Sequence, residues 1–360
     1  ETRKAGEEER KRDAEAAKRR QEVALNQQEY ERLQQWSDAE EPKHLAKNIK
    51  NPIFPNLHAD PEVMYSEKTG KFYIYPTTDG AYGWHSFDFH CLSSEDFKTW
   101  KDEGVILDLR DLTWGDREYA WAPCIIERKQ KDGYKYYFYF SANNPKTKRK
   151  EIGCAISDSP TGPFIDCGHP IITDADRPSD AKGGQAIDVD VFYDDATKKY
   201  YLYWGNGFMA GAELNDDMIS IKQDTKVNLT PKGGTLKDYA YREGTYVFNR
   251  KGTYYFLWSV DDTGADNYHV AYGTSKSPLG PIQVADSPII LQQDPSQQIY
   301  GTAHNSVLQI PGKDEWYIVY HRINPNFRER QLSPGTHRQV CIDRMTFDKN
   351  GKIIPIKPSR

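Results

Sequence analysis

Five aromatic runs recur along the chain at nearly even spacing, and this repeat constrains the fold more than any other feature. They begin at residues 72, 136, 200, 254 and 316 and read FYIY, YYFYF, YYLYW, YYFLW and WYIVY. Short aromatic and β-branched runs between clusters of Gly, Pro, Asn and Asp are typical of β-strands. A unit that recurs five times predicts five small sheets rather than one continuous sheet.

A strand-like segment stands on each side of every aromatic run. The preceding segments contain ADPEV, WAPCII, IDVDVFYD, REGTYVF and GTAHNSVL, and the following segments begin at Cys91, Cys154, Ala212, Ala271 and Cys341. Each unit then has three or four strands, and radial packing of such units leaves only short strand edges exposed. We therefore predict an all-β fold, a five-bladed β-propeller over residues 46–360. A β-sandwich is the main alternative, but it fits this repeat length poorly.

The first part of the chain, residues 1–45, has a different composition. Residues 1–36 contain nine basic and nine acidic residues and no Pro. Good helix formers dominate, but the first twenty residues offer almost nothing apolar to bury. We predict a charged helical arm and linker, mainly solvated. The alternatives are a spacer that holds the next domain away from an anchor and a helix that docks on that domain.

Charge, hydropathy and cysteine content exclude several classes of protein. The net charge of -5 gives no general attraction to nucleic acid or to an anionic membrane surface. No run approaches ~18 consecutive apolar residues, so we predict no membrane span. The five cysteines fit neither a zinc motif nor a disulfide framework, which indicates free, mostly buried thiols. We expect a monomer.

Polar residues stand at comparable places in the first strands of four units. They are Asp60, Asp188, Glu243 and His304. In a propeller the first strand of each blade lines the central channel, and a buried carboxylate needs a partner or a function. We therefore expect these four side chains to meet in one site.

The motifs HADP (58–61), WAP (121–123), IDVD (187–190), YREGTY (241–246) and GTAHNSV (301–307) together resemble glycoside hydrolase family 43. The resemblance spans about residues 50–360. It implies a five-bladed propeller that cleaves arabinosides and xylosides with inversion. It further implies that Asp60 is the general base, Asp188 the residue that adjusts the pKa of the acid, and Glu243 the general acid.

The chemistry of inverting hydrolysis agrees with these three roles. One carboxylate activates water and one carboxylic acid protonates the leaving oxygen. A third carboxylate beside the acid raises the pKa of that acid, because like charges resist joint ionisation. Asp190 lies two residues after Asp188 and should face the same side of the strand, so it competes for the third role.

Further residues are expected to bind substrate or metal. The resemblance implies that Arg338 grips sugar hydroxyls and a catalytic carboxylate, and His58 of HADP is assigned to the same substrate-binding group. Trp84 is predicted to stack on a sugar face, and Trp121 to lie beside the channel mouth and help to bind substrate. His304 matches a channel histidine that helps to hold a cation, often calcium, largely through water. No organic cofactor is predicted.

The predicted function is inverting hydrolysis of terminal sugars on plant-type polysaccharides. α-L-Arabinofuranosidase is the first choice, and β-xylosidase or cleavage of galactan or galactofuranosides are alternatives, because loops rather than fold decide specificity. Two further alternatives are a non-catalytic carbohydrate-binding propeller and a protein-interaction propeller. Polar loops at 108–120 and 173–186 favour attack at chain ends. Export is expected from the polysaccharide substrate and from a chain that begins with Glu1.

Overall fold

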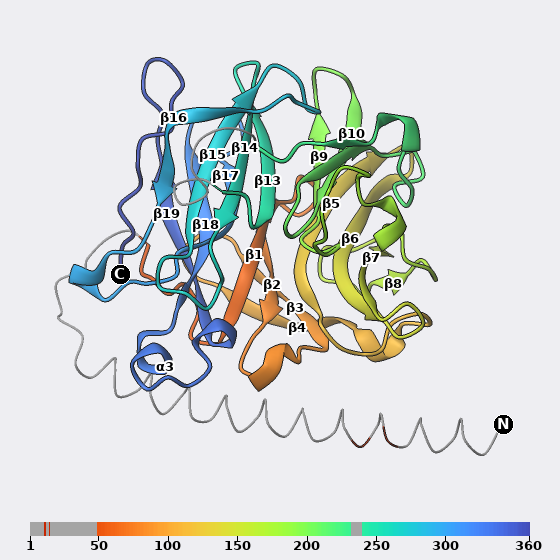
Figure 1. Ribbon diagram of the computed structural model, residues 1–360, viewed down its shortest axis with the longest axis horizontal. Coiled ribbons are helices and arrows are strands. Elements are labelled where there is room, and N and C mark those ends of the chain that lie inside the picture. The colour runs from red at the N-terminus through yellow and green to blue at the C-terminus, as the bar shows by residue number, and fades with distance from the viewer. Residues whose placement is uncertain (1–10, 12–13, 15–48, 232–239) are drawn as a thin grey trace.

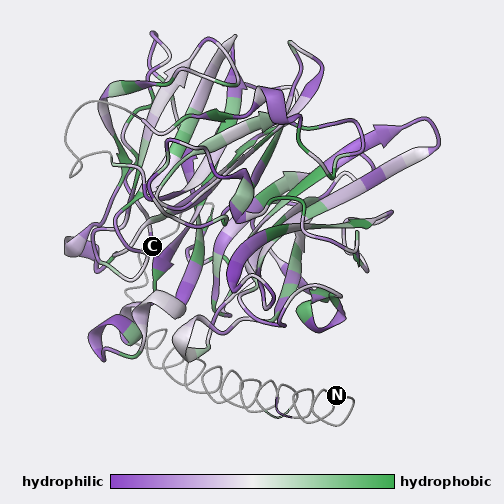
Figure 2. Cartoon of the chain, turned by 45° about the vertical axis from the view of Figure 1, so that its right-hand side comes forward, coloured by the Kyte–Doolittle hydropathy of each residue, from purple (hydrophilic) through white to green (hydrophobic). Residues whose placement is uncertain are grey.

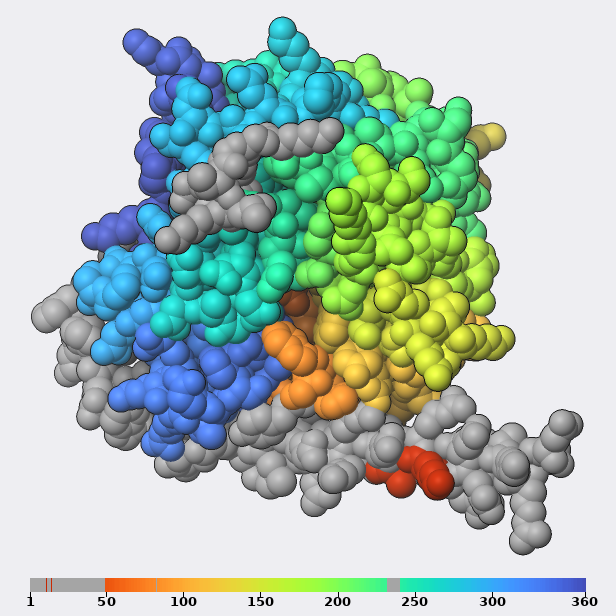
Figure 3. All heavy atoms as spheres, viewed as in Figure 1, coloured from red at the N-terminus to blue at the C-terminus, as the bar shows by residue number. Residues whose placement is uncertain are grey.

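The computed structural model describes residues 49–231 and 240–360, together with Lys11 and Ala14. The predicted helical arm and linker over residues 1–45 fall almost wholly outside the described residues. Within them, 19 strands form five separate sheets. Figure 3 shows that the sheets follow one another around the molecule in chain order, and that the last, in blue, lies beside the first, in orange. The predicted all-β five-bladed propeller is confirmed.

The blades differ little in size, with four strands in each of the first four and three in the fifth (Figure 1). Blade 1 contains β1 (His58–Tyr65), β2 (Phe72–Thr78), β3 (Asp88–Ser94) and β4 (Lys101–Asp108). Blade 2 contains β5 (Trp121–Gln130), β6 (Gly133–Asn144), β7 (Arg149–Ser157) and β8 (Ile165–Asp166). Blade 3 contains β9 (Asp190–Asp194), β10 (Lys199–Trp204), β11 (Ala210–Glu213) and β12 (Val227–Asn228). Blade 4 contains β13 (Glu243–Arg250), β14 (Thr253–Val260), β15 (His269–Ser275) and β16 (Gln283–Leu291). Blade 5 contains β17 (Ala303–Gln309), β18 (Trp316–Ile323) and β19 (Arg338–Met345).

Helices in the described residues are few and short. They are η1 (Tyr82–Trp84), η2 (Leu109–Asp111), η3 (Asp174–Asp176), η4 (Gln223–Thr225), η5 (Pro295–Gln297), α3 (Pro325–Glu329) and η6 (Pro334–Thr336). Across this part of the chain, none has the length and apolar character needed to cross a membrane.

The aromatic runs form the second strand of every blade, as predicted. Their side chains alternate between the two faces of the sheet, so each blade packs against both neighbours. Five apolar clusters result, one between each pair of successive blades, including the pair formed by blades 5 and 1. Figure 2 shows much of the hydrophobic colour on the strands and much of the hydrophilic colour on the turns. Full burial of one such aromatic side chain contributes about 1.5–3 kcal/mol.

The last blade is completed by residues from the start of the domain. The backbone N–H of Ile53 donates to the carbonyl of Val340 at 3.0 Å. The Asn51 side chain both donates to and accepts from the backbone of Ile342, at 3.1 and 2.9 Å. These bonds join the two ends of the described propeller and close the ring.

Each blade carries one left-handed residue at the same place, on its innermost strand or, in blade 3, two residues before that strand begins. These residues and their φ values are Asp60 (49°), Ala122 (42°), Asp188 (59°), Gly244 (70°) and His304 (50°). In blades 1, 2, 4 and 5 the pairing with the second strand also shifts at this point. A left-handed residue and a bulge break the two-residue alternation of a strand and turn local side chains toward a new direction. Here that direction is the mouth of the channel.

Hydrogen bonds between blades hold four of these left-handed residues. In each case the backbone N–H donates to a side chain on the second strand of the preceding blade. The pairs are Ala122 to Thr77 Oγ1 (2.7 Å), Asp188 to Ser141 Oγ (3.2 Å), His304 to Ser259 Oγ (2.9 Å) and Asp60 to His321 Nδ1 (3.1 Å). The last pair joins blade 5 to blade 1. Each preceding blade therefore holds the left-handed residue of the next blade in its strained backbone conformation.

Candidate active site

A pocket of about 390 Å³ opens at the mouth of the channel. Its volume is at the lower end of the range for small-molecule sites. Seven of the eight residues predicted for the site line it. The full lining is Asp60, Trp84, Trp121, Gln185, Ile187, Asp188, Asn206, Arg242, Glu243, Asp262, Thr263, His304 and Arg338.

Asp60 lies at the floor of the pocket among three positively charged or polar partners. Its Oδ1 is 3.1 Å from His304 Nδ1 and 3.3 Å from Arg338 Nη1, and its Oδ2 accepts from Thr77 Oγ1 at 2.7 Å. Burial alone raises the pKa of this carboxyl, but Arg338 and then His304 hold it well below the ordinary value. Asp60 is therefore ionised at neutral pH.

Arg338 begins β19 and is fixed by a second buried acid, Asp79. Its Nε and Nη2 donate to the two carboxylate oxygens of Asp79 at 2.8 and 2.9 Å, and its backbone N–H donates to Oδ2 at 2.9 Å. A bidentate pair of this kind fixes the plane of the guanidinium. The remaining Nη1 is thereby aimed at Asp60 and at Thr263 Oγ1, which is 2.9 Å away.

The pKa of Glu243 is shifted in the opposite direction from that of Asp60. Desolvation in the pocket raises the pKa of its carboxyl above the ordinary value, although His304 and a hydrogen bond from Asn206 lower it. Asn206 Nδ2 donates to Oε2 at 2.7 Å and Tyr268 Oη donates to Oε1 at 3.0 Å. The left-handed Gly244 follows directly, at a φ that only glycine adopts without strain. Two donors and the left-handed Gly244 therefore orient this carboxyl.

Asp188 is buried and has an oxygen without a hydrogen-bond partner. Burial, then Glu243 and Asp60, raise the pKa of its carboxyl well above the ordinary value. Its Oδ2 accepts no hydrogen bond and lies 4.0 Å from His304 Nδ1. The three carboxyl groups thus form one coupled electrostatic unit, in which His304 stands between Asp60 and Asp188.

Aromatic side chains form one wall of the pocket. Trp84 is 38% exposed and meets Trp121 edge to face, with ring centroids 6.3 Å apart. The indole N–H of Trp121 donates to the backbone carbonyl of Trp84 at 3.2 Å. The Arg338 guanidinium lies 5.9 Å from the Trp84 ring. An exposed indole beside buried polar groups is suited to stacking on a sugar ring.

His58 is the one predicted site residue that does not line the pocket. Its side chain is 3% exposed, with its ring about 6 Å from those of Phe54 and His90. Burial lowers the pKa of His58 to about 4, and neither ring nitrogen has a hydrogen-bond partner. The left-handed Asp60 breaks the strand alternation, so residues 58 and 60 do not share a face. The assignment of His58 to substrate binding thus has no geometric support.

Asp190 is not part of the pocket lining. One of its oxygens accepts from the backbone N–H of Val247 at 2.9 Å, and the other is 3.8 Å from Cys124 Sγ. Burial raises the pKa of Asp190 to about 7. The expected competition with Asp188 is not seen in the geometry, because only Asp188 lines the pocket.

Sequence reasoning missed four residues that position the site. His321, whose pKa burial lowers to about 4, accepts the Asp60 N–H, and its other nitrogen lies 3.2 Å from Thr263 Oγ1. Asp79 fixes Arg338, while Asn206 and Tyr268 orient Glu243. For His321 a signal existed, since it faces Ala303 in the position at which Thr77 faces Ala59 in blade 1. No comparable signal marks the other three.

Comparisons with known proteins agree with this geometry. The model of the family described as glycosyl hydrolases family 43 matches residues 49–353. A β-D-galactofuranosidase from Aspergillus niger is 34% identical, over 85% of this chain and 84% of that protein. A xylosidase/arabinosidase from Bacteroides ovatus is 28% identical, over 86% of this chain and 98% of that protein.

Solved structures show the same relationship. A thermostable family-43 glycoside hydrolase superposes with a TM-score of 0.72 at 26% identity, covering 87% of this chain and 97% of that one. A β-xylosidase/α-arabinofuranosidase from a compost microbial metagenome, in a calcium-free complex with xylotriose, gives 0.69 at 26% identity, covering 86% and 97%. The chain therefore belongs to glycosyl hydrolases family 43 and is a glycoside hydrolase.

Proposed function

We propose that the protein is an exo-acting, inverting furanosidase that removes terminal β-D-galactofuranosyl units. The observation that carries the reaction type is one pocket in which neighbouring carboxyl groups have opposite pKa shifts, lowered at Asp60 and raised at Glu243. When the pKa values of two neighbouring carboxyl groups are shifted in opposite directions, the group with the lowered pKa acts as base and the other acts as acid.

The three carboxyl groups take three roles in this proposal. Asp60 is ionised and removes a proton from the attacking water. Glu243 stays protonated near neutral pH and gives its proton to the leaving oxygen. Asp188 and Glu243 resist joint ionisation, so the pair keeps a proton to higher pH than an isolated carboxyl group would. Water attacks the anomeric carbon from the face opposite the leaving group, so the configuration is inverted.

Arg338, Trp84 and Trp121 are proposed to hold the sugar. Arg338 lines the pocket beside Asp60 and can reach a sugar hydroxyl while it keeps Asp60 ionised. The exposed face of Trp84 lies beside it. The limited volume of the pocket suits one terminal sugar better than an internal stretch of polymer.

The choice of sugar rests on the relatives. The 34% identical relative is named a β-D-galactofuranosidase. The sequence alone favoured α-L-arabinofuranose, which has the same ring configuration and lacks only C6, the terminal carbon of the exocyclic chain. That relation keeps arabinofuranose as the second candidate, also supported by the relative named xylosidase/arabinosidase. β-D-Xylopyranose, a six-membered ring, comes third.

A cation at the pocket floor is part of the proposal. The His304 ring and the unpartnered Asp188 Oδ2 lie close together, with Nδ1 4.0 Å from Oδ2, and could hold a hard cation largely through water. When bound, such a cation would offset the negative charge of the carboxyl groups. A related structure is described as calcium-free, which makes calcium the first ion to test.

The substrate class also bears on location and assembly. Polysaccharides that carry terminal furanosides lie outside the cell, so we propose that the protein acts there. A pocket formed by one chain needs no second subunit, and a monomer is proposed.

The function is tested with nitrophenyl β-D-galactofuranoside, α-L-arabinofuranoside and β-D-xylopyranoside, and by proton NMR of the first product. The proposal predicts fastest release from the galactofuranoside, with the product anomer inverted. Preference for the arabinofuranoside would change the proposed sugar but leave the proposed reaction in place. A retained anomer would overturn the assignment of Asp60 as base, and no release from these substrates or from branched polymers would favour a binding propeller.

A further inference from the structure

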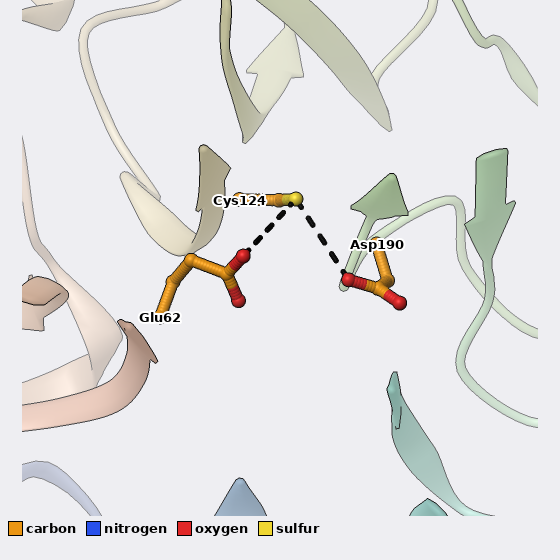
Figure 4. Close-up of side chains that lie close together, drawn as sticks. All are labelled: Glu62, Cys124 and Asp190. Carbon is orange, nitrogen blue, oxygen red and sulfur yellow. Dashed lines mark hydrogen bonds between the residues drawn. The ribbon is translucent and has the colours of Figure 1, made fainter. Parts of the chain in front are cut away.

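A second cluster lies in the channel, two residues beyond the left-handed positions of blades 1, 2 and 3. It consists of Glu62, Cys124 and Asp190, which we call the lower layer (Figure 4). Cys124 Sγ is 3.4 Å from Glu62 Oε1 and 3.8 Å from Asp190 Oδ1. One ligand atom from each residue lies within 4.8 Å of the other two. Three consecutive blades thus aim a thiol and two carboxyl groups at one point.

The lower layer is buried and lacks a compensating charge. The exposed fractions of Glu62, Cys124 and Asp190 are 8%, 0% and 3%. Among the described residues, no Lys, Arg or His forms a salt bridge with Glu62 or Asp190. Two carboxyl groups placed together in a dry interior are costly unless they are neutralised by protons or by a cation.

An independent observation points to a ligand here. Asn305 is 4% exposed, and both its amide nitrogen and its amide oxygen lack a hydrogen-bond partner. Asn305 lines the same small cavity as Glu62 and Asp190, while Cys124 lies outside its lining. Buried polar groups without partners are rare and call for an unseen ion or water. The cavity volume is about 10 Å³, enough for roughly one water-sized sphere.

We propose that Glu62, Cys124 and Asp190 directly bind one divalent cation of zinc's chemical class, beside the Asn305 amide. A tetrahedral zinc ion with one thiolate and carboxylate oxygens places sulfur and oxygen ligands roughly 3.5 Å apart, close to the separations of 3.4 and 3.8 Å found here. A cavity of this size has no room for a hydrated ion. Direct ligation by protein atoms follows.

Backbone donors already support the charged forms of two ligands. The N–H of Val191 donates to Cys124 Sγ at 3.2 Å, and the N–H of Val247 donates to Asp190 Oδ2 at 2.9 Å. Donors of this kind stabilise a thiolate and orient a carboxylate bound to metal. Thiolate and carboxylate together select zinc over calcium, which prefers oxygen ligands alone.

This site differs from the cation proposed near His304. That ion would be hard and water-bound at the pocket floor, whereas this one is held by protein atoms and a sulfur ligand. The cavity is also lined by Asp60, Asp188 and His304, so the two proposed cation sites adjoin one another.

The test measures zinc and calcium in the full chain by mass spectrometry, after incubation with zinc sulfate and desalting. We expect about one zinc per chain in wild type and in His304→Ala. We expect Cys124→Ser and Asp190→Asn to weaken zinc binding at least about 100-fold. Cys154→Ser is the matched control, since Cys154 is an equally buried thiol on β7 of the same blade, and it should keep full occupancy.

Three outcomes would overturn the proposal: no zinc in wild type, full zinc in a folded Cys124→Ser protein, or loss of zinc in His304→Ala but not in Cys124→Ser. Circular dichroism checks the fold of each variant. If Cys124→Ser does not fold, cobalt in wild type decides, because a thiolate ligand produces a near-ultraviolet charge-transfer band. Its absence would exclude Cys124 as a ligand. None of these readouts depends on hydrolysis, so failure of the proposed function leaves them intact.

Discussion

Two groups of acids in the channel share one scaffold and differ in what balances their charge. The catalytic layer, Asp60, Asp188 and Glu243, opens to the pocket and contacts Arg338 and His304. The lower layer lies two residues further along the strands and has no Arg, Lys or His partner among the described residues. The same five-fold frame thus builds one site in which Arg338 offsets the charge of the acids and another for which we propose a cation from outside.

The comparison shows how a propeller can separate two functions within a few residues. Left-handed residues, held by the preceding blade, turn the catalytic layer toward the mouth of the channel. The strands then resume their regular course, and the next inward positions form the lower layer. Catalysis and the proposed metal binding therefore use neighbouring positions of the same repeat unit.

The largest expected effect is that of Asp60→Asn. Loss of the base that activates water should reduce kcat by about 10⁴-fold on every substrate that the wild type cleaves. Asp262→Asn makes the same chemical change elsewhere in the pocket lining and serves as the control. Steady-state kinetics of both variants checks this. Substantial turnover by Asp60→Asn would move the base to another residue and break the division between the layers.

Glu243→Gln should have a large effect that depends on the leaving group. Proton donation matters most for poor leaving groups, so cleavage of natural glycosides should fall by about 10²–10⁴-fold and cleavage of nitrophenyl glycosides much less. Parallel kinetics on an alkyl and a nitrophenyl glycoside of the same sugar measures the difference. An equal loss on both would remove Glu243 from the role of acid.

A smaller change is expected from Asn206→Ala. Asn206 donates to the Glu243 carboxylate and so favours its ionised form. Without that donor the pKa of Glu243 rises further, the acid stays protonated to higher pH, and the alkaline limb of the kcat/KM profile should move up by about one unit. Asp262→Asn, which does not contact Glu243, should leave the limb in place. A shift to lower pH would contradict the electrostatic account.

The smallest effect concerns the scaffold common to both layers. Ala122 occupies in blade 2 the left-handed position that Asp60 occupies in blade 1, without a functional side chain. Ala122→Gly should relieve the strain and stabilise the fold by at most about 1 kcal/mol, with unchanged turnover. Thermal denaturation beside an activity assay measures both. A clear loss of stability would mean that the position is not strained.

Much of the fold could be predicted because the repeat is local in sequence. The aromatic runs identified the second strand of every blade, and the segments before them identified the channel strands. Asp60, Asp188, Glu243 and Arg338 could be selected from those segments and from family motifs. Aligning the repeats two residues further would also have placed Glu62, Cys124 and Asp190 together.

The features that the sequence did not predict depend on contacts between blades. His58 was assigned to the pocket by its motif, but in the structure it is buried outside the pocket lining. Asp79 and Tyr268 act through partners that lie far away in the chain. Cys124 showed no zinc spacing because its proposed co-ligands come from two other blades, whereas spacing rules describe ligands close in sequence.

One paired measurement tests the division between the layers most directly. Turnover of the preferred nitrophenyl furanoside and bound zinc are determined on the same samples of wild type, Asp60→Asn and Asp190→Asn. The account predicts that Asp60→Asn loses turnover and keeps about one zinc per chain, while Asp190→Asn loses zinc. Retained turnover in Asp60→Asn, or retained zinc in Asp190→Asn, would contradict it.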